Sequence, residues 1–156
     1  MAARPQALRE LFLVAALLIS LVASADVQVP SRRATRIVSL VPALTEMLFA
    51  IGAGRQVIAI SSYDRYPPEA QGLPRVGALL DPDTERIFSL RPDLVITYGS
   101  QLDLQTQLQR TGIPIFEYHH AGLTDVTATI RRLGAVTGRT ADAERVAGSK
   151  IGRAHV

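Results

Sequence analysis

The side chains best suited to binding chemistry in this chain stand at or just beyond the ends of four apolar runs. They are Pro42, Ser62, Tyr63, Tyr98, Gly99 and His119. Hydroxyl and imidazole groups beside aromatic surface suit a large, flat, partly polar ligand better than a phosphate. The pattern alone leaves two interpretations open, a ligand site or ordinary loop residues.

Catalytic motifs are mostly absent from the sequence, and its one metal-binding pattern is weak. Gly52-Ala53-Gly54 follows a predicted helix, whereas a dinucleotide fingerprint follows a strand, and there is no Walker glycine loop. Ser39 and Ser61 lack the Gly-x-Ser-x-Gly setting of a nucleophile. The pair His119-His120 lacks helical spacing and has no cysteine partner, which is a weak pattern for zinc. We therefore predict no catalytic residues, no metal and no cofactor.

The apolar runs are typical of buried strands, and amphipathic stretches separate them. Strands are predicted at 36–41, 56–61, 93–98 and 113–118, and helices from Pro42 to about Ile51 and at 82–90, 102–110 and 124–138. This alternation predicts an α/β fold, a Rossmann-like parallel sheet with helices on both faces. Pro114 places the last strand at or near an edge. Ligands of such sheets bind outside the carboxyl ends of the strands, where the candidate residues fall.

The segment from Asp81 to Ile96 contains half of one βαβ unit. We predict that Asp81 caps a helix whose first residue is Pro82. Ile87, Phe88 and Leu90 form the apolar face of this helix. The next strand follows Arg91-Pro92, since a residue before proline is disfavoured in a helix.

The first 25 residues are predicted to be a secretory signal peptide. Basic residues precede the apolar run 11–22, and Ala23-Ser24-Ala25 fits a signal peptidase site. Residues 26–35 are predicted to be a flexible leader. The sequence has no cysteine, so we expect a soluble periplasmic product that is not a lipoprotein. The net charge of +3 comes largely from basic residues in the terminal segments, so the body of the chain is nearly neutral. It therefore lacks the basic patch expected of a nucleic-acid-binding protein.

The last six residues, Ile151 to Val156, match the translation of a common sequencing adapter. We interpret residues 150–156 as adapter read-through, with the natural sequence ending near Ser149. A chance hexapeptide is the alternative, and the coding DNA distinguishes the two.

Three motifs resemble the N-terminal lobe of class III periplasmic substrate-binding proteins of ABC importers. They are R-I-V-S-L-V-P-A-L-T-E-M-L-F-A-I-G (Arg36 to Gly52), S-S-Y-D-R-Y-P-P (Ser61 to Pro68) and T-E-R-I-F-S-L-R-P-D-L-V-I (Thr84 to Ile96). The first and third are shared by the haem, siderophore and cobalamin branches, whereas the second is narrower and points to the corrinoid branch that binds vitamin B12.

The resemblance, from about Arg36 to Ala147, implies one lobe of a two-lobed protein with its ligand between the lobes. Residues 36–139 would form the N-terminal lobe, and residues 140–149 the start of a truncated interlobe helix. The implied function is capture of cobalamin or a related corrinoid and delivery to an ABC permease and its ATPase, by a monomer. The alternatives are a ferric siderophore or haem carrier, and a small periplasmic Rossmann-like enzyme.

The resemblance also implies roles for single residues. Tyr63 matches a tyrosine that lies against the corrin ring, and Glu85 a glutamate that docks on permease arginines. Leu79 stands where the vitamin B12 branch has a cleft tryptophan, and Ala78 where the haem branch has a ligating tyrosine. The alternatives are that Tyr63 packs under the double proline and that Glu85 only complements the helix dipole.

Overall fold

Four parallel strands form one sheet in the computed structural model, which describes residues 33–119 and 123–152. The strands are β1 (Ile37–Ser39), β2 (Val57–Ile60), β3 (Leu94–Tyr98) and β4 (Ile115–Tyr118), in the order β2-β1-β3-β4. Each neighbouring pair is parallel, so all four carboxyl ends lie at one edge. The predicted parallel sheet is confirmed, as is the edge position of the strand that follows Pro114.

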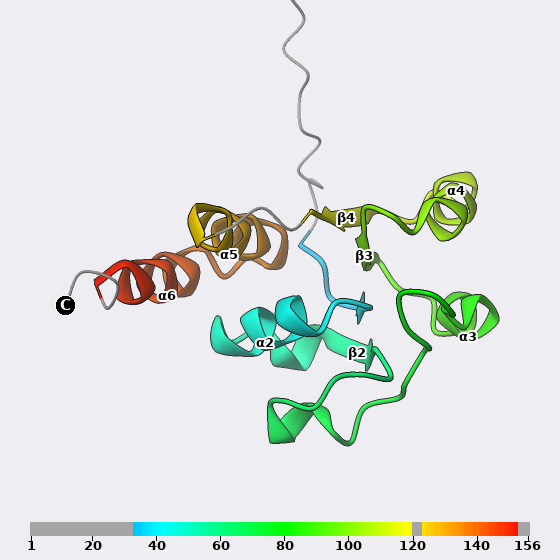
Figure 1. Cartoon of the computed structure of the whole chain (residues 1–156), viewed down its shortest axis with the longest axis horizontal. Helices are drawn as coiled ribbons and strands as arrows, with labels where there is room; N and C mark the ends of the chain where they lie inside the picture. Colours follow the sequence, from blue (N-terminus) through cyan, green and yellow to red (C-terminus); the bar gives the residue numbers. More distant parts are fainter. Residues whose placement is uncertain (1–32, 120–122, 153–156) are drawn as a thin grey trace, which may run out of the picture.

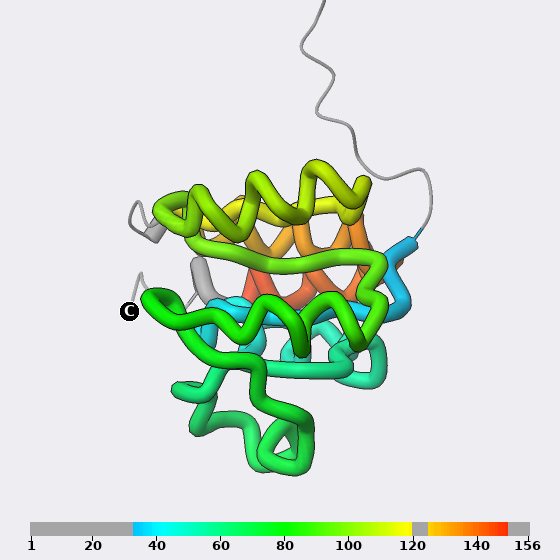
Figure 2. Tube along the Cα trace, turned by 90° about the vertical axis from the view of Figure 1, so that its right-hand side faces the viewer, coloured from blue at the N-terminus to red at the C-terminus, as the bar shows by residue number. Residues whose placement is uncertain are grey.

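Helices cover both faces of the sheet, as predicted (Figures 1 and 2). One face carries α2 (Pro42–Ala50), α5 (Leu123–Thr137) and α6 (Thr140–Gly152), and the other carries α3 (Thr84–Ser89) and α4 (Leu102–Arg110). Two short 3-10 helices, η1 (Gly54–Gln56) and η2 (Pro68–Ala70), flank β2. No helix in the described ranges is long and apolar enough to cross a membrane.

The two faces have separate apolar cores because successive strand residues point to opposite sides. On the first face, Ile37, Leu94 and Ile96 pack with Leu44 and Leu48 of α2 and with the buried residues of α5 and α6. The second core lies under α3 and α4, and its members are Val38, Leu40, Ala59, Val76, Ile87, Val95, Leu104 and Leu108. Both cores hold the strands rigidly below the loops at their carboxyl ends.

Helix α3 begins later than predicted. Its N-cap is Asp83, whose carboxylate accepts a hydrogen bond from the backbone N–H of Arg86 at 3.0 Å. The predicted cap by Asp81 is wrong because residues 77–82 form a turn, with an isolated bridge between Gly77 and Pro82. Gly77 has a φ of 81°, a conformation that favours glycine. The apolar face is confirmed, since Ile87 is buried and Phe88 and Leu90 pack on the second core.

Helices α5 and α6 pack closely against each other. A Cβ atom added to Gly134 would lie 2.4 Å from the Cβ of Ala143, so the crossing requires a glycine there. Ala143 and Ala147 are buried in the first core. Helix α5 begins at Leu123, one residue before the predicted cap Thr124. The last described residues of the predicted read-through, 150–152, continue α6.

The start of β1 is held by Asp93. Its carboxylate accepts hydrogen bonds from the backbone N–H groups of Thr35 and Arg36 and from the Thr35 hydroxyl, at 2.7 to 3.0 Å. Partial burial would raise the pKa of Asp93, but these hydrogen bonds together lower it. Ala34 also donates to Val136 O, so the folded lobe includes the last two residues of the predicted leader. The signal segment and leader residues 26–32 lie outside the described residues.

Candidate functional site

The carboxyl ends of the strands bring the predicted ligand residues to one edge of the sheet. In spatial order, Ser62 and Tyr63 follow β2, Pro42 follows β1, Tyr98 and Gly99 end β3, and His119 follows β4. Strands β1 and β2 end level with Ile96 of β3, since Ser39 pairs with Ile60 and Ile96, whereas β3 and β4 continue two residues further, to the pair Tyr98 and Tyr118. The fold therefore places all six predicted residues along one side of the lobe.

Tyr63 lies on the surface at this edge, with 69% of its area exposed. Its backbone N–H donates to the hydroxyl of Ser61, and the neighbouring Ser62 N–H donates to Gly77 O at 2.7 Å. The guanidinium of Arg75 donates to the carbonyl oxygens of Ser61, Ser62 and Asp64, at 3.0 to 3.3 Å. The loop is thus fixed from below while the phenol ring faces outward. This exposure contradicts the alternative that Tyr63 is a packing residue.

Leu79 reaches the same edge from the turn before α3. The buried side chain of Gln101 donates to Leu79 O at 3.1 Å and accepts from the Tyr98 N–H at 3.0 Å. Tyr98 in turn meets Tyr118 edge to face, with ring centroids 6.1 Å apart. Burial, then the neighbouring Tyr118 and Asp64, raise the pKa of Tyr98, so its phenol stays protonated at neutral pH.

His119 and Gly99 also touch each other at this edge. A Cβ atom on Gly99 would lie 2.3 Å from His119 Cε1, so the imidazole ring packs directly against the glycine. His119 Nε2 pairs with Glu117 Oε1 at 2.8 Å. Among the described residues, no group of three or more histidine, cysteine, aspartate or glutamate side chains could hold a metal ion.

Large apolar side chains are exposed around these residues. Leu79 and Leu80 stand at the turn before α3 and Leu102 at the start of α4, and Leu80 is 95% exposed. The hydrogen bond from Gln101 to Leu79 O brings the two segments together. Contiguous exposed apolar surface often marks a site of contact with a ligand or a partner protein. This edge is suited to a large ligand with apolar area.

Asp64 is a buried residue that the sequence analysis missed, because it stands between polar and aromatic residues in a predicted loop. Its side chain is fully buried, and neither carboxylate oxygen has a partner of good hydrogen-bond geometry. Burial raises the pKa of this carboxyl, whereas the Thr45 hydroxyl, the Ser61 backbone and the charge of Arg75 lower it in part. Arg75 and Gln101 hold the loops of this edge through hydrogen bonds to backbone carbonyl groups, and Asp64 lies buried beside Arg75.

Glu85 lies in the first turn of α3 and is exposed. Arg36, at the start of β1, donates through Nη2 to Leu90 O at the end of α3. Helix α3 therefore runs antiparallel to the strands, and its first turn lies toward their carboxyl ends. The carboxylate of Glu85 is thus exposed at the end of α3 that lies toward the carboxyl ends of the strands.

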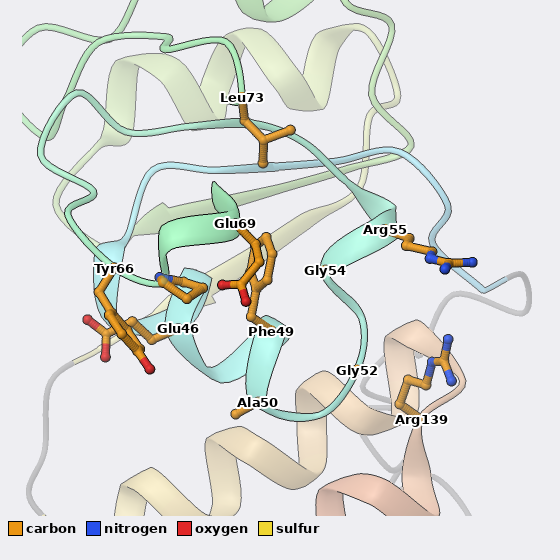
Figure 3. A pocket seen from close by; sticks show the side chains of 11 residues that line it. Glu46, Phe49, Ala50, Gly52, Gly54, Arg55, Tyr66, Glu69, Leu73 and Arg139 are labelled. Atoms are coloured by element: carbon orange, nitrogen blue, oxygen red, sulfur yellow. The ribbon is translucent and has the colours of Figure 1, made fainter. Parts of the chain in front are cut away.

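A separate groove of about 690 Å³ runs along the outer side of α2 (Figure 3). None of the residues predicted from the sequence lines it. Glu46 and Tyr66 lie at one end, and Arg55 and Arg139 at the other. The lining residues are Glu46, Phe49, Ala50, Gly52, Gly54, Arg55, Tyr66, Pro67, Glu69, Leu73 and Arg139.

The fold and the sequence define the class of protein. The profile of the family described as "Periplasmic binding protein" matches residues 37–149, and the chain belongs to this family. The predicted resemblance to the N-terminal lobe of class III periplasmic substrate-binding proteins is thereby confirmed.

Individual relatives are similar to the same part of the chain. A vitamin B12-binding protein of Pectobacterium carotovorum is 38% identical over 114 residues, and that of Yersinia pestis is 34% identical over 121 residues. These matches cover 72% and 76% of this chain but 41% of each relative. The chain therefore spans less than half the length of these relatives.

Solved structures give the same result. The periplasmic vitamin B12 binding protein BtuF of Vibrio cholerae superposes with a TM-score of 0.72 at 30% identity, covering 77% of this chain and 48% of BtuF. The periplasmic heme-binding protein RhuT of Roseiflexus has a TM-score of 0.66 at 32% identity, covering 72% of this chain and 44% of RhuT.

Proposed function

We propose that this chain is the N-terminal lobe of the periplasmic substrate-binding component of an ABC importer, and that its ligand is cobalamin or a related corrinoid. The observation that carries the proposal is the exposed position of Tyr63 in the loop after β2, which the hydrogen bond from Ser62 N–H to Gly77 O joins to the turn that bears the exposed Leu79 and Leu80. An aromatic ring and several leucines provide the flat apolar area that a corrin ring requires. The similarity to vitamin B12-binding proteins supports this ligand over others.

In this proposal the edge of the sheet is one wall of the binding cleft. Tyr63, Leu79 and Tyr98 contact the ring, while Ser62, Gly99, Pro42 and His119 line the wall. The second lobe, outside this chain, supplies the other wall. The corrinoid is cargo, and the protein has no cofactor or metal of its own.

The proposal includes secretion and delivery. A cleavable signal at residues 1–25 exports the protein to the periplasm without lipid attachment. Glu85, on the rim of the lobe, pairs with permease arginines, and the permease and its ATPase import the corrinoid. The protein acts as a monomer.

Binding of cyanocobalamin by the full-length protein, measured by titration calorimetry, tests the proposal. Tyr63→Ala is expected to weaken the affinity about tenfold to a hundredfold, because it removes a large contact area. Tyr66→Ala is the matched control, since Tyr66 is 60% exposed but lines the separate groove along α2. Tyr66→Ala should leave the affinity of the protein for cyanocobalamin unchanged. Equal affinities of both variants and the parent protein would contradict the role of Tyr63.

Haem is the second candidate ligand, because the RhuT relative is a heme-binding protein at comparable identity. Ala78, where the haem branch has a tyrosine, cannot ligate iron, which favours the corrinoid. Hemin titration followed by the Soret band distinguishes the two ligands. Tight hemin binding without any response to cyanocobalamin would overturn the corrinoid assignment.

A further inference from the structure

Gln101 links two loops of the candidate site. It is the residue before α4, and only 6% of its surface is exposed. Its carbonyl oxygen accepts a hydrogen bond from the Tyr98 N–H at 3.0 Å. Its amide nitrogen donates to Leu79 O at 3.1 Å and to Ala78 O at 3.4 Å. One side chain thus joins the end of β3 to Leu79, which lies 22 residues before Gln101.

The turn that Gln101 holds is rigid at its base and exposed at its tip. Ala78 N donates to Asp81 O, and Asp83 N donates to Val76 O, each at 3.0 Å. Leu80, at the tip, is 95% exposed. The base of the turn is therefore defined by its own backbone bonds and by the Ser62 N–H, which donates to Gly77 O at 2.7 Å, whereas the Gln101 side chain joins the turn to the end of β3.

We propose that Gln101 is a positioning residue for the ligand. It sets the separation of Leu79 and Tyr98 so that the two present one continuous surface to a flat ring. An amide suits this position because it supplies a donor for the Leu79 carbonyl and an acceptor for the Tyr98 N–H on the same buried group. The ligand in this inference is that of the proposed function.

Gln105 provides a matched control on the same helix. It is 7% exposed, and its amide donates to Thr97 Oγ1 at 3.2 Å and to Tyr98 O at 2.9 Å. It fastens α4 to β3 without reaching the turn at residues 77–82. Gln101→Met and Gln105→Met each keep the side-chain length and remove the amide, and both should lower the Tm.

The first experiment needs no ligand. Hydrogen–deuterium exchange of full-length protein reports the segment 76–83, and Gln101→Met should raise its exchange rate about threefold to tenfold. Gln105→Met should leave this segment unchanged. Unchanged exchange in Gln101→Met would overturn the inference.

The second experiment measures cyanocobalamin affinity. Gln101→Met should weaken binding about threefold to tenfold, with less than a twofold effect of Gln105→Met. In a Leu79→Ala background the effect of Gln101→Met should largely disappear, because Gln101 acts through Leu79. Full additivity, or an equal loss in both methionine variants, would show a general structural role and contradict the proposal. If the parent protein bound no cyanocobalamin, the proposed function would fail, while the exchange experiment would still decide the role of Gln101.

Discussion

Replacing Asp64 with asparagine is expected to stabilise the protein at neutral and alkaline pH. The carboxylate is fully buried beneath the loop that carries Tyr63, and neither oxygen has a hydrogen-bond partner of good geometry. Burial therefore raises its pKa, and Glu46 adds to this shift, whereas Thr45, Ser61 and Arg75 offset part of it. Asparagine keeps the shape of the side chain and removes the buried charge.

The magnitude follows from the cost of an unsatisfied buried group. That cost is about 1 to 3 kcal/mol, and larger for a charge. Arg75 lies close enough to compensate in part, although its guanidinium donates to backbone carbonyl groups. We expect Asp64→Asn to raise the free energy of unfolding by about 1 to 2 kcal/mol at pH 8. For a lobe of this size, the Tm should rise by about 4 °C per kcal/mol.

The gain should depend on pH. The pKa of Asp64 is higher in the folded state than its unfolded value near 3.9, so the folded state holds the proton more strongly. Its contribution to wild-type stability is present at low pH and is lost as the pH rises through the raised pKa. Asparagine does not titrate, so its advantage should shrink toward zero below about pH 4.

Urea unfolding followed by circular dichroism from pH 4 to pH 8 measures this difference. Glu46→Gln is the control, because Glu46 is exposed on α2 near the same carboxylate. It should change the free energy of unfolding by less than about 0.5 kcal/mol. The reasoning would be refuted if Asp64→Asn were less stable than wild type at pH 8. It would also be refuted if the gain in free energy of unfolding were the same at pH 4 as at pH 8.

Three further predictions concern other parts of the lobe. Asp93→Ala should destabilise the lobe by about 2 kcal/mol at pH 7. Because the pKa of Asp93 is lowered in the folded state, urea unfolding should show this difference begin to shrink below about pH 4 and disappear only as the pH falls through the lowered pKa; a difference that stays constant down to the acid limit of folding would contradict it. Gly134→Leu should cost about 1 to 3 kcal/mol in thermal unfolding because its side chain meets Ala143, and an unchanged Tm would show that α6 moves freely. Glu85→Arg should leave cyanocobalamin affinity unchanged yet reduce uptake by vesicles carrying the permease; normal uptake would leave Glu85 as a helix-dipole acid only.

Much of the secondary structure could be predicted because its causes are local. Helix α4 matches its predicted range, Leu102–Arg110, since Leu104 and Leu108 lie one turn apart and Thr111-Gly112 ends the helix. The strands were found in the correct places but are shorter than predicted. Backbone pairing with neighbouring strands decides where a strand ends, and the apolar run alone does not encode it.

The start of α3 shows where local rules compete. Asp81 and Asp83 are both good N-cap residues, and Pro82 favours the earlier start. Tertiary structure selects Asp83, because Gly77 and Pro82 pair across a turn and remove residues 81 and 82 from the helix.

The sequence by itself determined which residues follow each strand, and parallel pairing was enough to bring Tyr63, Tyr98 and His119 to one edge. Only the tertiary structure decided what supports them. Asp64 carries a charge, which predicts exposure, yet the loop closes over it. Gln101 reaches Leu79 across 22 residues, and Arg75 reaches Ser61 across 14. Such contacts depend on how the loops fold back in space. The periodicity of apolar residues along the sequence indicates only the helix or strand to which each residue belongs.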